Sequence, residues 1–304
     1  MIPPRHDPVP VEVLRQVRRI ELRTRGPVNS RFSGEYQSVF KGQGLEFVEV
    51  REYLPGDDVR TIDWNVSART GVPHVKRYIE ERELTVLLLV DLSGSQRFGT
   101  RVRFKSELVA EVAAVLAMSA SRNNDRVGLL IFTDRIELFV PPGKGRRHVL
   151  RMIRELLGFR PEGRGTGIAP ALEYAARALR ARSILFLFSD FQAGEGWPGF
   201  ERALGTASQR HDVVAVRLTD PREEELPDAG LVRLEDPESG ERVVLDLGRP
   251  AVREGYLKLV REDRERLRRL LRRLGVDEIE LRTDVPYTTA LLGFFRKRET
   301  RLRR

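Results

Sequence analysis

The sequence predicts an α/β fold, with a doubly wound, mostly parallel sheet and a small N-terminal accessory segment. Short, nearly continuous apolar runs recur along the chain, as expected of strands buried on both faces of a parallel sheet. Amphipathic segments with helical spacing separate these runs, so strands and helices alternate. Four core strands are predicted, at Leu84–Val90, Val127–Phe132, Ile184–Phe188 and Val213–Val216.

Helical segments are expected to connect the core strands. After the first strand, Val109, Val112 and Leu116 fall on one face of a helix. Ile136–Val140 follows the second strand and is expected to pair with it as a hairpin. Further helices are predicted at Arg147–Leu157, Ala169–Arg180 and Glu201–Gln209.

The C-terminal part completes the predicted domain. Leu231–Leu247 is typical of an edge hairpin with its turn at residues 237–240, and a long basic helix is predicted at Tyr256–Leu274. A last short strand is expected at Asp277–Leu281. The apolar stretch Tyr287–Phe295 is interpreted as a helix covering an open face of the sheet, in preference to a lipid-binding segment, because it is short.

The pattern changes near residue 80, so we predict an accessory segment at 1–80 and the α/β domain at 81–304. Val13, Val17 and Ile20 have helical spacing, and Gly34–Gly44 is a Gly-rich polar stretch.

The composition limits the classes of function. The net charge is +9, which makes nucleic acid, an anionic membrane or an acidic protein surface possible partners. Six of the 54 basic residues are lysines and 48 are arginines, and the 45 carboxylates offer the arginines internal partners. The absence of cysteine excludes disulfides, thiol catalysis and Cys-ligated metal sites. The four histidines are too far apart in sequence for a local zinc motif.

No membrane span or signal peptide is predicted. The longest uncharged runs, Val112–Ser121 and Val285–Phe295, are well short of the ~20 apolar residues that cross a bilayer. The N-terminal residues lack the apolar core of a signal peptide. A cytoplasmic location is therefore expected.

Polar side chains gather where predicted strands end. Asp91, Ser93 and Ser95 follow the first core strand, and Asp190 follows the third. Thr166 lies in a Gly-rich loop at the entrance of a helix. In open α/β sheets, ligands bind beyond the carboxyl ends of the strands, so these five residues form the candidate site. Two carboxylates and three hydroxyls suit Mg²⁺ or Mn²⁺ better than zinc.

These residues resemble the metal-ion-dependent adhesion site of von Willebrand factor A-like domains, which have a Rossmann-type sheet. Residues 125–129 are similar to the entry of their second strand. The resemblance implies that Ser93 and Ser95 bind the metal directly and Thr166 directly or through water. It assigns Asp91 and Asp190 to contacts through water or to holding the hydroxyls, and leaves one position for an acidic side chain of a protein ligand. Phe191 stands where such domains often have Gly.

Residues 51–69 resemble the signature of the domain-of-unknown-function family fifty-eight, whose members carry this segment just ahead of such a domain. Pro55 and Gly56 are expected to form a turn and Asp57 and Asp58 to cap the following helical turn. Arg51, Arg60 and Arg69 are expected to pair with Glu52, Asp58 and Asp63. A charge network that locks the segment to the domain and a binding role both remain open. The signature residues are Arg51, Tyr53, Gly56, Asp57, Asp58, Arg60, Asp63, Trp64 and Arg69.

The family resemblance implies a protein-interaction adaptor without enzyme activity, because members typically occur with MoxR-type AAA+ ATPases. Such an adaptor would use its metal site to help the ATPase remodel or mature a client protein.

Two alternatives to the adaptor function remain. The basic helix and C-terminal tail suggest nucleic-acid binding, but the tail lacks interleaved aromatic residues and the helix carries acidic residues on its polar face. A metal-dependent hydrolase receives less support, because the Gly-x-Ser-x-Gly motif is missing and no histidine has a defined role.

Overall fold

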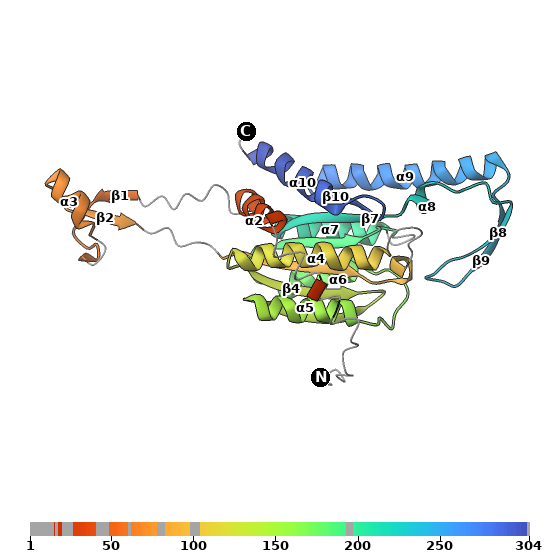
Figure 1. The fold of residues 1–304 in the computed structure, drawn as a ribbon, viewed down its shortest axis with the longest axis horizontal. Coiled ribbons are helices and arrows are strands. Elements are labelled where there is room, and N and C mark those ends of the chain that lie inside the picture. The colour runs from red at the N-terminus through yellow and green to blue at the C-terminus, as the bar shows by residue number, and fades with distance from the viewer. Residues whose placement is uncertain are drawn as a thin grey trace.

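The computed structural model describes residues 15, 18–19, 27–40, 49–59, 62–77, 83–97, 104–192 and 197–302 (Figure 1). Its centre is a six-stranded sheet in the order β10-β7-β6-β3-β4-β5. Neighbouring strands are parallel except β4 and β5, which form the predicted antiparallel pair. The predicted α/β class with a mostly parallel sheet is thus confirmed, and the arrangement is consistent with a von Willebrand factor A-like fold. The strands are β3 (Thr85–Asp91), β4 (Arg126–Phe132), β5 (Ile136–Gly143), β6 (Ile184–Ser189), β7 (Asp212–Thr219) and β10 (Asp277–Arg282).

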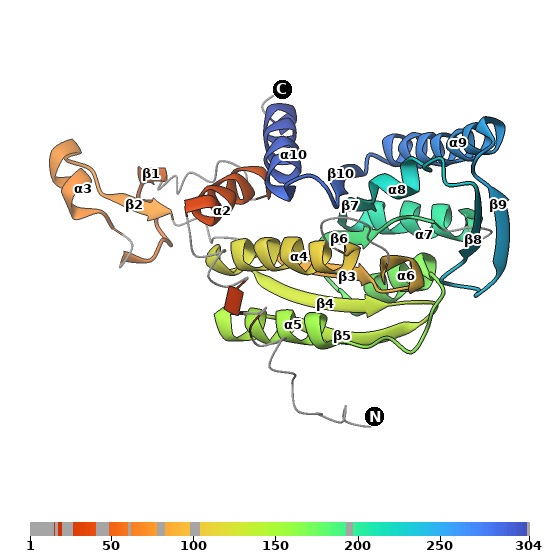
Figure 2. The same cartoon turned by 45° about the vertical axis from the view of Figure 1, so that its right-hand side comes forward.

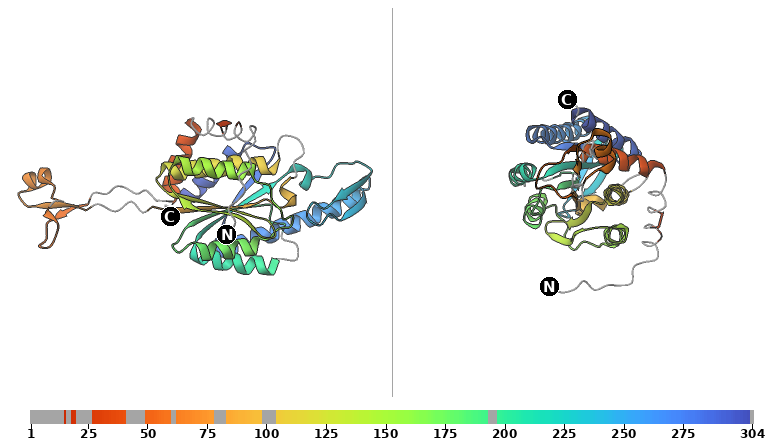
Figure 3. Two further views of the ribbon diagram at one scale, coloured as in Figure 1. Left: turned by 90° about the horizontal axis from the view of Figure 1, so that it is seen from below. Right: turned by 90° about the vertical axis from the view of Figure 1, so that its left-hand side faces the viewer.

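The inner strands β3, β4, β6 and β7 are mostly apolar because helices cover both faces of the sheet. In β3, Val86, Leu88 and Val90 face one core layer, whereas Leu87 and Leu89 face the other. The first layer is covered by α2 (Pro27–Phe40), α4 (Lys105–Arg122), α5 (Arg146–Gly158) and α10 (Tyr287–Leu302). The second is covered by α6 (Ile168–Ala178), α7 (Trp197–Arg210) and α9 (Pro250–Leu274). Figure 3 shows the sheet between these layers, most clearly in its left view.

Helix α2 corrects one sequence prediction. Gly34–Gly44 is predicted to be a Gly-rich polar stretch, but residues 27–40 are helical and contribute Phe32, Tyr36 and Val39 to the core. Their spacing places them on one face, which outweighs the low helix propensity of Gly34. Phe40 meets Phe186 of β6 at a ring-centroid distance of 5.8 Å. Although it precedes residue 80, α2 packs on α4 and α10 of the α/β domain.

The C-terminal elements also differ from the prediction in detail. Helix α9 begins at Pro250, six residues before the predicted start. Proline is favourable in the first turn of a helix, because the backbone N–H groups there have no partner within the helix. Helix α10 runs on to Leu302, and Leu291, Phe294 and Phe295 are buried as expected for a helix that covers the sheet. The basic tail is thus helical as far as the structure describes it.

The predicted edge hairpin is not part of the central sheet. Strands β8 (Leu231–Glu235) and β9 (Arg242–Asp246) form a separate two-stranded antiparallel sheet, and the edge strands of the central sheet are β10 and β5. Two short helical elements lie at the same end of the sheet, η2 (Gly94–Arg97) and α8 (Pro221–Glu224). Figure 2 shows the hairpin beyond the end of the sheet, beside the start of α9.

Residues 49–77 contain a small unit of their own. Strands β1 (Glu49–Glu52) and β2 (His74–Arg77) pair antiparallel, with α3 (Trp64–Thr70) between them. Residues 41–48 and 78–82, which join the unit to the rest of the chain, lie outside the described residues, as do Val13, Val17 and Ile20.

Within the part of the chain that the structure describes, no helix has both the length and the apolar character needed to cross a bilayer.

Candidate functional site

The candidate site lies where β3 and β6 end side by side. The two strands are parallel neighbours, so Asp91 at the end of β3 and Asp190 just after β6 reach the same edge of the sheet. Asp91 is fully buried. One carboxylate oxygen accepts a hydrogen bond from the backbone N–H of Ser93 at 2.9 Å, and the other accepts one from the Ser189 hydroxyl at 2.7 Å. Asp91 is therefore held rigidly by its neighbours.

The Asp91 carboxylate is hydrogen-bonded to two neutral donors, the Ser93 N–H and the Ser189 hydroxyl. Burial raises its pKa to about 7, and the nearby charge of Asp190 adds to this effect, whereas the hydrogen bonds from Ser189 and Ser93 oppose it. A divalent cation near Asp91 would reverse the unfavourable interaction between the two carboxylates.

The two serines lie directly beside Asp91. Their hydroxyl oxygens are 3.1 Å apart and both side chains are buried; Ser93 directly precedes η2 and Ser95 lies within it. Between them, the Gly94 N–H donates to the carbonyl of Arg164 at 2.7 Å. This backbone contact joins the turn to the Gly-rich loop that carries Thr166.

Thr166 contacts a residue that the sequence analysis missed. Its hydroxyl donates to a carboxylate oxygen of Glu238 at 2.7 Å, and Glu238 lies on the turn of the β8–β9 hairpin. Burial raises the pKa of Glu238, the Thr166 hydrogen bond opposes this, and the charge of Asp190 raises it further. The Ser95 hydroxyl also interacts with Glu238. The five predicted residues thus form one cluster, completed by Glu238.

A buried lysine is the second unexpected component. The Lys105 ammonium group, at the start of α4, donates to Asp190 at 3.1 Å and also contacts Glu223 of α8. The side chain is completely buried. Burial lowers its pKa, but the carboxylates of Asp190 and Glu223 outweigh this effect and raise it overall. Lys105 therefore supplies one positive charge to a cluster of carboxylates.

The donor set fits a hard divalent cation. Three hydroxyls and two carboxylates from separate segments come together, and Asp91 is buried close to the charge of Asp190. Within the described residues, no group of three His, Cys, Asp or Glu side chains is arranged as a metal site, so the fit rests on the hydroxyls. Metal binding itself stays a prediction.

A cavity of about 590 Å³ opens beside the cluster. Its lining includes Ser95, Asp190 and Glu238 of the cluster, together with Trp197 and Arg266. The Arg266 guanidinium lies 4.5 Å from the centre of the Trp197 ring. Phe191, which also borders the cavity, has a φ of +59°, a conformation that Gly adopts more easily. The Phe191 N–H donates to the Ser189 hydroxyl at 3.0 Å.

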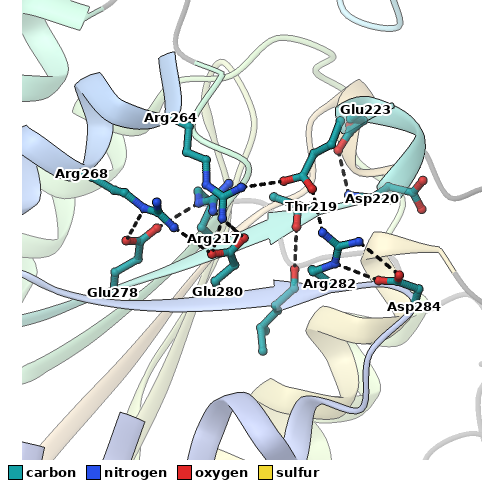
Figure 4. A network of polar contacts seen from close by, with 12 residues as sticks. Arg217, Thr219, Asp220, Glu223, Arg264, Arg268, Glu278, Glu280, Arg282 and Asp284 are labelled. Carbon is teal, nitrogen blue, oxygen red and sulfur yellow. Dashed lines mark hydrogen bonds and ion pairs between the residues drawn. The ribbon is translucent and has the colours of Figure 1, made fainter. Parts of the chain in front are cut away.

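A second charged cluster lies between β7, β10 and α9 (Figure 4). Arg217 of β7 donates to Glu278 at 2.9 Å, and Arg264 of α9 donates to Glu280 at 2.6 Å. Arg282 pairs with Glu224 at 2.7 Å. Burial raises the pKa of Glu280, but Arg217 and Arg264 outweigh this and lower it. We call this cluster the arginine network; it fixes α9 against the sheet.

The signature residues of the N-terminal unit have mainly structural contacts. Arg51 forms a bidentate ion pair with Asp57 at 2.6 and 2.7 Å, an acid that was predicted to be a cap. Asp63, predicted as an arginine partner, caps α3 by accepting from the backbone N–H groups of Asn65 and Val66. Gly56 has a φ of +109°, in keeping with the predicted turn.

The other signature residues are placed as follows. The Tyr53 N–H donates to the carbonyl of Pro73, and Trp64 is 71% exposed at the start of α3. Asp58 and Arg69 are exposed, and Arg60 lies outside the described residues.

Four residues that contact the site were not predicted from the sequence: Lys105, Ser189, Glu223 and Glu238. Ser189 could have been found, because it directly precedes Asp190 at the end of a core strand. Lys105, Glu223 and Glu238 have no local signal, since each reaches the site from another element.

Comparison with known proteins agrees with this fold. An uncharacterised protein of Mycobacterium tuberculosis (strain H37Rv) is 35% identical over 285 residues, covering 93% of this chain and 88% of the relative. Among solved structures, an aerotolerance-related membrane protein from Bacteroides fragilis, with multiple mutations to serines, matches with a TM-score of 0.50 and 16% identity. That match covers 71% of this chain and 99% of the other.

The VWA domain of SpRpn10 is similar at 10% identity and a TM-score of 0.39, covering 69% of this chain and 94% of that one. Residues 49–266 match the family model described as protein of unknown function DUF58, which includes both the N-terminal unit and the candidate site. The chain therefore belongs to the DUF58 family.

Proposed function

We propose that the protein is a metal-dependent interaction module that recognises an acidic side chain of a partner protein. The supporting observation is that five polar side chains come together where β3 and β6 end, beside an open cavity: Asp91, Ser93, Ser95, Thr166 and Asp190. Bound Mg²⁺ or Mn²⁺ would supply a Lewis-acidic centre that attracts a carboxylate. Ser93, Ser95 and Thr166 would hold the metal, while Asp91 and Asp190 orient the hydroxyls and balance its charge.

The proposed action is recognition without chemical turnover. Ser93 and Ser95 contact each other and Asp91 lies beside them, but among the described residues that contact them or line the cavity there is no histidine that could act as a base. The resemblance to DUF58 proteins that occur with MoxR-type AAA+ ATPases suggests the partner. The module would help such an ATPase act on a client protein in the cytoplasm.

Nucleic-acid binding receives less support as an alternative. Several arginines of α9 and α10 already pair with carboxylates of the same chain: Arg264 with Glu280, Arg268 with Glu280, and Arg298 with Asp277. Arginines engaged in this way contribute less to binding a phosphate backbone. Their pairing accounts for part of the basic charge.

Affinity capture from a native lysate tests the proposed docking. The full chain serves as bait, with Mg²⁺ or with EDTA, and captured proteins are identified by mass spectrometry. Ser93→Ala removes one expected metal ligand, and Thr206→Ala removes an exposed hydroxyl on α7 as a matched control. We expect an AAA+ ATPase to be captured by the wild type and by Thr206→Ala in Mg²⁺ only. Equal capture by Ser93→Ala, or in EDTA, would contradict metal-dependent docking.

A further inference from the structure

The turn of the β8–β9 hairpin places a carboxylate at the candidate metal site. Glu238 is half-buried, whereas its neighbours Pro237 and Ser239 on the turn are exposed. Its side chain accepts the Thr166 hydrogen bond at 2.7 Å and interacts with Ser95, and it borders the same cavity as Asp190. Glu238 therefore contacts two of the three hydroxyls of the site.

The turn is shaped to present this side chain. Asp236 accepts hydrogen bonds from the Glu238 N–H at 3.0 Å and from the Ser239 hydroxyl at 2.6 Å. Gly240 has a φ of +75°, and its N–H donates to the Asp236 carbonyl. These contacts fix the turn locally, whatever the hairpin rests against.

The hairpin also fits closely against the turn between the two serines. A Cβ atom at Gly94 would lie 2.4 Å from the carbonyl oxygen of Pro237, closer than any side chain tolerates. Gly94 thus allows the hairpin to reach the site. Because Gly94 has no side chain, the hairpin can pack closely enough for the Glu238 carboxylate to reach Thr166.

The remainder of the hairpin is less firmly attached. It forms its own two-stranded sheet, and Leu231, Val243 and Val244 are at least 50% exposed. Elements with few buried apolar contacts open at a lower free-energy cost than the core does. The hairpin can therefore move away while the central sheet stays intact.

We infer that Glu238 is an internal carboxylate ligand of the metal site, and that it occupies the position which an acidic side chain of a partner takes. The hairpin then acts as a tethered competitor: a partner's carboxylate binds only when Glu238 leaves. This inference rests on the proposed function, because it needs a metal at the site. It adds the source of the competing carboxylate and the element that must move.

Mn²⁺ binding to the full chain, followed by water-proton relaxation, tests this inference. We expect Glu238→Gln to weaken Mn²⁺ binding by about tenfold, as loss of a supporting ligand typically does. At saturating Mn²⁺, the relaxation enhancement should rise, because water replaces the carboxylate. Acetate should then lower that enhancement at a smaller concentration in Glu238→Gln than in the wild type. Glu241→Gln, an exposed carboxylate of the same hairpin, is the matched control and should match the wild type.

Each result separates the two proposals. If Glu238→Gln gives the same relaxation enhancement as Glu241→Gln while Ser93→Ala loses Mn²⁺ binding, the internal ligand is wrong and the metal site stands. If the wild type binds no Mn²⁺, the proposed metal-dependent function fails, and the internal ligand fails with it. Circular dichroism of each variant confirms that the fold is retained.

Discussion

The candidate metal site and the arginine network show two ways of placing carboxylates in the same α/β domain. In the arginine network, Glu280 lies between Arg217 and Arg264, and their charges lower its pKa. At the candidate site, Asp91 faces hydroxyls and another carboxylate, and its pKa rises to about 7. The first cluster neutralises itself and serves stability. In the second, Lys105 pairs with Asp190 and Glu223, whereas Asp91 is held by the neutral donors Ser93 and Ser189, which suits the cluster to binding a cation.

Replacing Lys105 is expected to have the largest effect and tests whether the carboxylates of the candidate site need a cation. Lys105→Met removes the buried cation and leaves Asp190 and Glu223 without it, so we expect the metal-free protein to lose about 3–5 kcal/mol of unfolding free energy. Added Mg²⁺ should restore more stability to this variant than to the wild type. Urea unfolding with EDTA or Mg²⁺ measures both effects.

A surface lysine provides the control for Lys105. Lys144→Met removes an exposed ion pair with Glu83 and should change stability little, with or without Mg²⁺. Equal stability of Lys105→Met and the wild type in EDTA would show that the buried carboxylates do not need this cation.

Glu280 tests the self-neutralised cluster. Glu280→Gln weakens the pairs with Arg217 and Arg264, and because the side chain is 26% exposed we expect a loss of only about 1–2 kcal/mol. The loss should be independent of Mg²⁺. Urea unfolding with and without Mg²⁺ is again the measurement, with the exposed Glu265→Gln on α9 as a control. A loss that depends on Mg²⁺ would contradict the separation of the two clusters.

The two clusters should also respond to pH in opposite directions. The pKa of Asp91 is raised in the folded state from 3.8, so the metal-free folded protein binds more protons than the unfolded chain between about pH 4 and 7. The Asp91 contribution to stability therefore rises as pH falls through this window. The lowered pKa of Glu280 has the opposite effect: its contribution is present above the unfolded pKa and is lost as pH falls below about 4.5.

Asp91→Asn makes this difference measurable. In EDTA, the stability of the wild type relative to Asp91→Asn should increase from about pH 8 to about pH 5, because only the wild type takes up this proton. Unfolding in urea at several pH values provides the data. A difference that stays constant over this range would show that Asp91 is already neutral or is paired with a cation.

The smallest expected effect concerns Gly94. Gly94→Ala places a Cβ atom against the backbone of Pro237, so the hairpin should move and be cleaved faster by trypsin. Global stability should change little, since the hairpin lies outside the central sheet. Gly205→Ala on α7, where the nearest neighbour would be 3.7 Å away, is the control. Unchanged cleavage of Gly94→Ala would mean that the hairpin does not depend on this contact.

Much of the fold follows from local sequence patterns. The core strands are apolar runs because both of their faces are buried. Such a run can be recognised in the sequence even when the strands beside it are unknown. Helix α2 was missed because Gly34 and the polar residues around it obscured the stripe formed by Phe32, Tyr36 and Val39. The apolar stripe indicates a helix here in spite of the glycine.

The candidate site was predictable only in part for a different reason. Asp91, Ser93 and Asp190 follow core strands, so parallel topology alone brings them to one edge. Lys105 and Glu238 reach that edge from α4 and the hairpin, and no local pattern indicates where those elements pack. The residues that modify the site thus come from tertiary packing.

An anomalous difference map from crystals soaked in Mn²⁺ tests the central claim most directly. The account predicts a peak at the edge of the sheet, in contact with the hydroxyls of Ser93 and Ser95 and close to Asp91 and Asp190. Crystals of Ser93→Ala, soaked in the same way, should lose this peak. A wild-type map without density at this edge, at saturating Mn²⁺, would contradict the claim that the hydroxyl and carboxylate cluster is a metal site.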